Sequence, residues 1–185
     1  MRVAIKFLVA IPIPEPELGI IAGIKASLRP EGWHDTINPH ITLLAPDRPL
    51  MSFDDAAKSF QTAFSESTEF LIRAKLVKHF AHRNHRVLFF SPTPKAPLLK
   101  LYRTALNRSP WQETTASIKR AYYPHITLAS HLPTNKSIQI EEELQALRLD
   151  LQFNCTKICL YAKQQNWQRW QQVAESTLCK SQNQQ

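Results

Sequence analysis

The sequence predicts a fold built from two copies of one strand–helix unit that face each other across a shared groove. The pentapeptide Pro-His-Ile-Thr-Leu occurs twice among the 185 residues, at 39–43 and at 124–128. Self-similarity within a chain is typical of repeated structure. The predicted elements also repeat: strand, helix, motif strand, helix, strands, and then helix, motif strand, helix, strands. We therefore expect two halves that are related by a pseudo-twofold axis.

The first predicted elements surround the first motif. Alternating large apolar residues at 3–11 predict a buried strand, which ends at a run of three prolines spaced two apart. Residues 17–28 carry apolar side chains at helical spacing and predict an amphipathic helix. The motif itself predicts a short strand at 40–44.

A second helix and a hairpin complete the first half. Ser52, with Asp55 three residues later, resembles a capping box that begins a helix through about residue 64. Two strands are predicted near 69–79 and 86–91. The polar residues between them predict a hairpin turn.

The second half repeats this order. Thr93 and Pro94 predict the start of a helix over about 96–107, and the second motif predicts a strand at 124–129. Thr134 is expected to cap a helix that reaches about residue 147. Alternating apolar residues from 149 onward predict a strand that continues to 161, and a last strand is expected within 167–174.

Composition limits the class of protein. With 43% hydrophobic residues, the chain is long enough for a single domain over 1–185 made of two pseudo-symmetric lobes. No stretch reaches the roughly 20 consecutive apolar residues of a membrane-spanning helix, so no membrane partner is expected. Cys155, Cys159 and Cys179 are odd in number and form no Cys-x-x-Cys pair, which favours free thiols in the cytoplasm. We expect a monomer.

The net charge of +8 is unevenly distributed. Residues 70–112 contain no Asp or Glu. The basic residues of this segment are Arg73, Lys75, Lys78, Arg83, Arg86, Lys95, Lys100, Arg103 and Arg108. Such a segment favours a polyanionic partner such as nucleic acid; the alternative is a solvated basic face that only keeps the protein soluble.

The two motifs carry the chemistry. Residues two apart on a strand share a face, so His40 with Thr42, and His125 with Thr127, each present an imidazole beside a hydroxyl, while the isoleucine between them points into the core. Two histidines on opposite sides of a phosphodiester can act as general base and general acid. Two threonine hydroxyls are suited to the non-bridging phosphate oxygens. This chemistry requires neither a metal nor a cofactor.

The segments His40-Ile41-Thr42-Leu43 and His125-Ile126-Thr127-Leu128 resemble the paired His-x-Thr-x motifs of the two-histidine (2H) phosphoesterases. This superfamily contains the 2'-5' RNA ligase family and RNA 2',3'-cyclic phosphodiesterases. The resemblance implies an α+β fold of two lobes, in which antiparallel sheets flank a central cleft and the motifs lie on central strands. Many relatives carry a basic residue shortly after the second motif, where this chain has Ala129-Ser130-His131.

The same resemblance implies a function. It predicts hydrolysis of 2',3'-cyclic phosphate at RNA ends, usually to a 2'-phosphate and without a metal, with ligation as a possible reverse reaction. His40 and His125 would be the catalytic acid and base, and Thr42 and Thr127 would bind the phosphate. A small nucleotide such as an ADP-ribose cyclic phosphate is an alternative substrate, and a non-catalytic RNA-binding protein is a third hypothesis.

Two further groups of residues invite a functional interpretation. His79, His82 and His85 are spaced three apart, which suits one face of neither a strand nor a helix, so a basic or solvated hairpin tip is favoured over a zinc site. Aromatic side chains flank both motifs, where they could stack on RNA bases or fill the core. These aromatics are Trp33, Trp111, Tyr122 and Tyr123.

Overall fold

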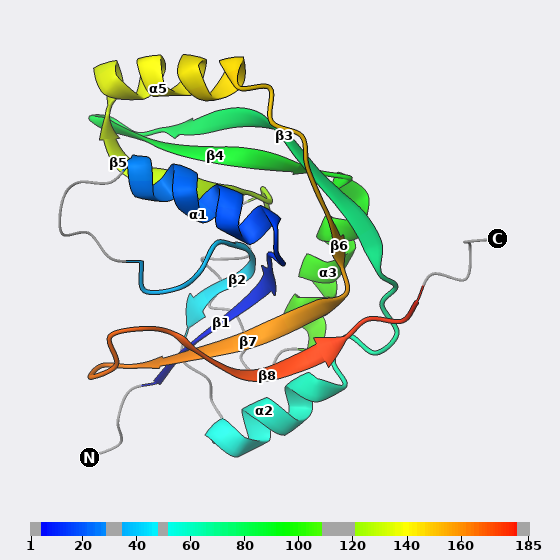
Figure 1. Cartoon of the computed structure of the whole chain (residues 1–185). Coiled ribbons are helices and arrows are strands. Elements are labelled where there is room, and N and C mark those ends of the chain that lie inside the picture. Colours follow the sequence, from blue (N-terminus) through cyan, green and yellow to red (C-terminus); the bar gives the residue numbers. More distant parts are fainter. Residues whose placement is uncertain (1–4, 29–34, 48–51, 109–120, 181–185) are drawn as a thin grey trace.

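The fold consists of two antiparallel sheets and the helices that cover them (Figure 1). We describe it from a computed structural model, over residues 5–28, 35–47, 52–108 and 121–180. The strands are β1 (Ile5–Pro12), β2 (His40–Asp47), β3 (Phe70–Ala81), β4 (His85–Thr93), β5 (Ile126–Pro133), β6 (Leu151–Cys155), β7 (Lys157–Gln164) and β8 (Gln171–Thr177). The helices are α1 (Glu17–Ser27), α2 (Phe53–Gln61), α3 (Lys95–Arg108) and α5 (Thr134–Ala146). This architecture confirms the predicted α+β class.

Each sheet has its motif strand at one edge. The strand orders are β2-β1-β7-β8 and β5-β4-β3-β6, and all neighbouring strands within these two sheets are antiparallel. The edges β2 and β5 are in contact with each other, so the motifs meet in the middle of the molecule. The resemblance implied central strands; β2 and β5 are central in the molecule but are edge strands of their sheets. The outer side of an edge strand carries backbone N–H and C=O groups that no strand of its own sheet pairs with. Side chains of the other lobe can form hydrogen bonds with these groups.

Two strand–helix–strand units each place their helix on the motif strand of the other unit. The unit β1–α1–β2 corresponds to β4–α3–β5, because in each unit the first strand pairs with the motif strand. Helix α1 packs against β5, and α3 packs against β2, so each helix covers the motif strand of the other lobe. The second copy therefore begins with the strand β4 and not, as the sequence suggested, with a helix.

A strand predicted as continuous is divided in two. Residues 151–155 pair with β3, whereas residues 159–164 of β7 pair with β1 in the other sheet. The division at Thr156 coincides with a change in burial. Strand β6 alternates between buried and exposed residues, but β7 has three consecutive buried residues because both of its faces are covered.

The helix ends test two capping predictions. The Ser52 hydroxyl accepts a 3.2 Å hydrogen bond from the Asp55 backbone N–H, which confirms the predicted cap of α2. The predicted cap at Thr134 is wrong. Thr134 is already the first residue of α5, and Pro133, which precedes it, has no side chain that could accept a hydrogen bond.

The core lies behind the motif faces. Ile41 and Ile126 are both fully buried, as the alternation in the motifs predicts. Cys155 and Cys159 are buried free thiols, and Cys179 is an exposed one. Among the described residues, none of the helices has the length and apolar character needed to cross a membrane.

Candidate active site

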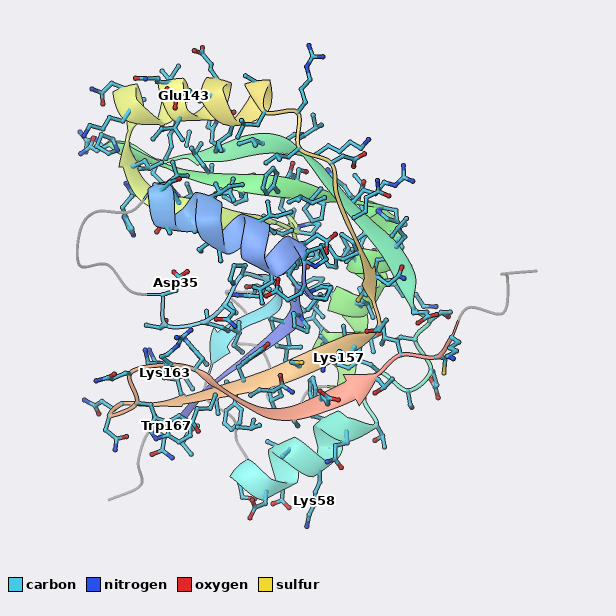
Figure 2. The ribbon with its side chains drawn as sticks, viewed as in Figure 1. Asp35, Lys58, Glu143, Lys157, Lys163 and Trp167 are labelled. Carbon is cyan, nitrogen blue, oxygen red and sulfur yellow. The ribbon has the colours of Figure 1, made fainter. Side chains whose placement is uncertain are left out.

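A cleft of about 850 Å³ contains all four residues that the motifs predict. His40 and Thr42 reach it from β2, and His125 and Thr127 reach it from the start of β5. Its other walls come from the end of α1, from residues 35–39, from the rest of β5 and from Lys136, Ile140 and Glu143 of α5. Figure 2 shows two acidic residues of this lining, Asp35 and Glu143, on either side of α1.

The two histidines are held in the same way. The Nδ1 atom of His40 lies 2.8 Å from the carbonyl oxygen of Asn38, and the Nδ1 atom of His125 lies 2.8 Å from the carbonyl oxygen of Tyr123. A carbonyl oxygen can only accept, so each Nδ1 carries the hydrogen. In each ring Nε2 is therefore the nitrogen that can exchange a proton with a ligand.

Burial lowers the pKa of both histidines from 6.5. For His40 the positive charges of Lys25 and of His125 add to this effect, while the Asn38 carbonyl and the Asp35 carboxylate oppose it. The effect of His125 on the pKa of His40 means that the two rings are electrostatically coupled. Because each positive charge disfavours the other, a state with one neutral and one protonated ring is populated at intermediate pH. That is the state that acid–base catalysis needs.

Two aromatic rings of the sheet, from β3 and β4, pack against one side of the His125 ring. The ring centroids of Phe80 and Phe89 lie 5.2 and 5.5 Å from the centroid of the His125 ring. Phe89 pairs directly with Thr127 across β4 and β5, so it lies on the same face of the sheet as the second motif. These rings exclude water from one side of His125, which is the physical origin of its lowered pKa.

Side chains from each half hold the motif strand of the other half. The Lys25 ammonium on α1 donates a 3.2 Å hydrogen bond to the carbonyl oxygen of Thr127 and lies 3.5 Å from the Asp35 carboxylate. The Tyr122 hydroxyl donates a 3.0 Å hydrogen bond to the carbonyl oxygen of Thr42. The Tyr122 ring stacks on Tyr102 at a centroid distance of 4.2 Å. Tyr122 therefore belongs to the lobe interface, and Lys25 is a site residue that the sequence did not reveal.

The segment before His40 is anchored by the connection between β7 and β8. The Trp170 backbone N–H donates to the Thr36 carbonyl oxygen at 2.8 Å, and the Arg169 guanidinium donates to the Asn38 side-chain oxygen at 3.0 Å. Asn38 is the residue whose carbonyl oxygen orients His40. The position of the first histidine thus depends on the far end of its own sheet.

The histidines of the β3–β4 hairpin separate into two groups. The Nδ1 atom of His79 lies 2.9 Å from the Glu141 carboxylate on α5. The rings of His82 and His85 stack on each other, and His131 on β5 stacks on His85. Within the described ranges no three His, Cys, Asp or Glu residues converge as metal ligands.

Of the other flanking aromatics, Tyr123 supplies the carbonyl oxygen that orients His125. Its ring has the Lys95 ammonium 4.7 Å from its centroid. Trp33 and Trp111 lie outside the residues that the structure describes.

A family comparison fits this arrangement. Residues 13–167 match the family model of the 2'-5' RNA ligase superfamily. The chain belongs to this superfamily. The match includes both motifs and confirms the resemblance drawn from them. No curated protein matches the chain significantly in sequence.

Solved structures share the fold of this superfamily member. TT0787 of Thermus thermophilus has 15% identity and a TM-score of 0.67, and the match covers 93% of this chain and 97% of TT0787. LigT of E. coli in its apo form has 16% identity and a TM-score of 0.61, covering 94% and 97% of the two chains. LigT complexed with 3'-AMP has 17% identity and a TM-score of 0.61, covering 95% and 99%. These similarities establish the fold, and membership in a two-histidine phosphoesterase superfamily supports an enzyme of the phosphoesterase kind.

Proposed function

We propose that the protein hydrolyses 2',3'-cyclic phosphate at RNA ends and leaves a 2'-phosphate. The observation that carries this proposal is the pair of histidines in one cleft, each with Nδ1 bound to a carbonyl oxygen and Nε2 left for proton transfer. Two such groups on one phosphate can complete a displacement in a single step.

The reaction balances with the residues of the cleft. The neutral histidine takes a proton from water through Nε2 as the water oxygen bonds to phosphorus. The bond from phosphorus to the 3' oxygen breaks, and the protonated histidine gives its proton to that oxygen. The first ring ends protonated and the second neutral, so one proton exchange with solvent restores the pair. No step requires a metal, and the activity is expected to survive a chelator.

Thr42, Thr127 and Lys25 can stabilise the phosphate. Thr42 and Thr127 line the cleft beside the histidines, where their hydroxyls can donate to the non-bridging oxygens. Lys25 adds a positive charge that is close enough to influence His40. In-line displacement at phosphorus depends mostly on positioning and electrostatic stabilisation, and these groups can supply both.

Two observations support RNA as the substrate. Residues 70–112 contain basic residues but no Asp or Glu. The segment that forms β3, β4 and α3 therefore carries a net positive charge, which favours binding to a polyanion such as RNA. A similarly folded protein, LigT of E. coli, has been crystallised with 3'-AMP. A ribonucleotide with a phosphate at its end is consistent with the cleft of this chain.

The experiment that tests the proposal uses pure protein and an oligoribonucleotide that ends in a 2',3'-cyclic phosphate, with and without EDTA. We expect one product, a 2'-phosphate, at equal rates in both conditions. An oligonucleotide with a 3'-hydroxyl end is the control and should remain intact. RNA binding without hydrolysis would instead identify a non-catalytic binder, and hydrolysis of an ADP-ribose cyclic phosphate alone would identify a small-nucleotide enzyme.

A further inference from the structure

Three histidines form a stack that reaches the cleft through His131. The ring centroids of His82 and His85 are 4.6 Å apart with an angle of 13° between their planes, and those of His85 and His131 are 4.8 Å apart with an angle of 30°. His85 is half-buried between them, while His82 and His131 are exposed. The two outer rings can therefore each offer a flat face to a ligand.

The stack meets the cleft through His131, while His82 and His85 lie outside the cleft lining. His131 lines the same cleft as His40 and His125. His131 follows His125 by six residues along β5, which corresponds to roughly 20 Å at the rise of a strand. A ligand whose phosphate lies between His40 and His125 reaches the stack only if it extends along β5.

The stacked geometry favours a flat partner over a metal ion. Nearly parallel rings direct their nitrogen lone pairs side by side, whereas metal ligands must converge on one point. Nucleobases stack on aromatic side chains, and histidine is among those used for single-stranded RNA. The backbone of His131 has a φ of 60°. Only a few residue types adopt this conformation readily, and histidine is one of them.

Two basic residues and one carboxylate belong to the hairpin tip and to the cleft lining near His131. Lys136 on α5 also lines the cleft, and Arg83 lies at the tip of the same hairpin. The acidic residue of this part of the lining, Glu143, accepts a 2.7 Å hydrogen bond from Gln139. The Glu141 carboxylate interacts with His79 and Arg86 on the other face of the sheet.

We propose that this end of the cleft binds the RNA nucleotides that precede the terminal phosphate, with one nucleobase stacked on the exposed face of His131. This inference rests on the proposed function and specifies its substrate as an RNA strand rather than a mononucleotide. In a mononucleotide the base and the cyclic phosphate share one ribose, so its base stays near the catalytic pair.

The test compares a cyclic-phosphate mononucleotide with a hexanucleotide that carries the same end. The variant His131→Asn removes the ring but keeps a residue that tolerates a positive φ. His79→Gln is the matched control, because it removes an imidazole from the same hairpin on the face that contacts α5. Urea unfolding of both variants checks that the fold is retained.

We expect His131→Asn to lower kcat/KM for the hexanucleotide by roughly 5- to 100-fold more than for the mononucleotide. His79→Gln should change the ratio of the two substrates by less than a factor of two. An abasic residue at the position that stacks should lower the wild-type rate and have little further effect in His131→Asn, because both changes remove the same contact. Equal losses on both substrates, or no loss on the hexanucleotide, would overturn the inference.

A binding measurement separates this inference from the proposed function. If the wild-type protein hydrolyses neither substrate, the proposed function fails. The anisotropy of a fluorescent hexanucleotide with a 3'-phosphate end still measures the RNA site. Weaker binding by His131→Asn supports the stack as an RNA site, and equal affinity of the wild type and the variant refutes it.

Discussion

The hydroxyl of Tyr122 donates a 3.0 Å hydrogen bond to the carbonyl oxygen of Thr42, which joins the segment before the second motif to the first motif strand. The two residues are 80 positions apart in sequence. Burial raises the pKa of Tyr122, so its hydroxyl remains a donor throughout the physiological range. One backbone carbonyl of the edge strand β2 is thus hydrogen-bonded to a side chain of the other lobe.

Replacing Tyr122 by Phe removes this hydrogen bond and keeps the ring that stacks on Tyr102. The carbonyl oxygen of Thr42 then loses its partner in a partly buried position. We expect the free energy of unfolding to fall by about 1 kcal/mol. Urea titrations followed by fluorescence measure the change. Tyr122→Leu, which also removes the stack, should be less stable than Tyr122→Phe; equal stability of Tyr122→Phe and wild type would show that the bond contributes nothing.

The pH dependence should follow the lowered pKa of both histidines. The pair is active when one ring is neutral and the other is protonated, and this state is most populated between the two pKa values of the pair. Because both values are shifted below 6.5, kcat/KM should be highest below pH 6.5. A bound phosphodiester favours the imidazolium, so the kcat profile should lie at higher pH than the kcat/KM profile. A kcat/KM optimum above pH 7 would contradict a lowered pKa for His40 and His125.

Lys25 and Asp35 should move the pH profile in opposite directions. Lys25 lowers the pKa of His40 and Asp35 raises it. Lys25→Met should therefore shift one limb of the kcat/KM profile to higher pH, and Asp35→Asn should shift the same limb to lower pH. If the alkaline limb moves, His40 is the acid; if the acidic limb moves, His40 is the base.

Lys58→Met is the control for these shifts. Lys58 lies on α2, well away from Asp35 in Figure 2, and does not line the cleft. The variant Lys58→Met removes one positive charge, as Lys25→Met does, and should leave both limbs of the kcat/KM profile at their wild-type pH. Shifts in the same direction for Lys25→Met and Asp35→Asn would mean that His40 does not respond to these charges.

The protonation of the histidine rings can be observed without any substrate. Above their pKa values, His40 and His125 should both be the tautomer with hydrogen on Nδ1, because each Nδ1 donates to a carbonyl oxygen. Two-bond proton–nitrogen correlation spectra distinguish this tautomer from the one with hydrogen on Nε2. Assignment by His40→Gln and His125→Gln identifies the signals. Hydrogen on Nε2 in either ring would remove the proposed proton-transfer atom.

The sequence predicted the features that local pattern determines. The placement of His40 and Thr42 opposite Ile41 follows from the alternation of a strand, and the identity of the two motifs indicated the duplicated fold. The Ser52 cap also depends on neighbouring residues only. Such features are readable because the interacting residues lie a few positions apart.

Features that depend on the assembly of the two halves could not be predicted. The division at Thr156 arises because β6 and β7 pair with strands of different sheets. Lys25 contacts Thr127 across 102 positions, and no local pattern relates them. The run of hairpin histidines was visible in the sequence, but His79 lies on the other face of the sheet and His131 joins the stack from β5.

The most direct test of the account is the rate of cyclic-phosphate hydrolysis by His40→Ala and His125→Ala, measured with the same oligoribonucleotide at the optimum pH. If the two rings act as acid and base on one phosphate, each single variant should lose about 10²- to 10⁴-fold in kcat. The double variant should lose little more than either one, because the groups act as a unit. Activity within a few-fold of wild type in either single variant would contradict the account.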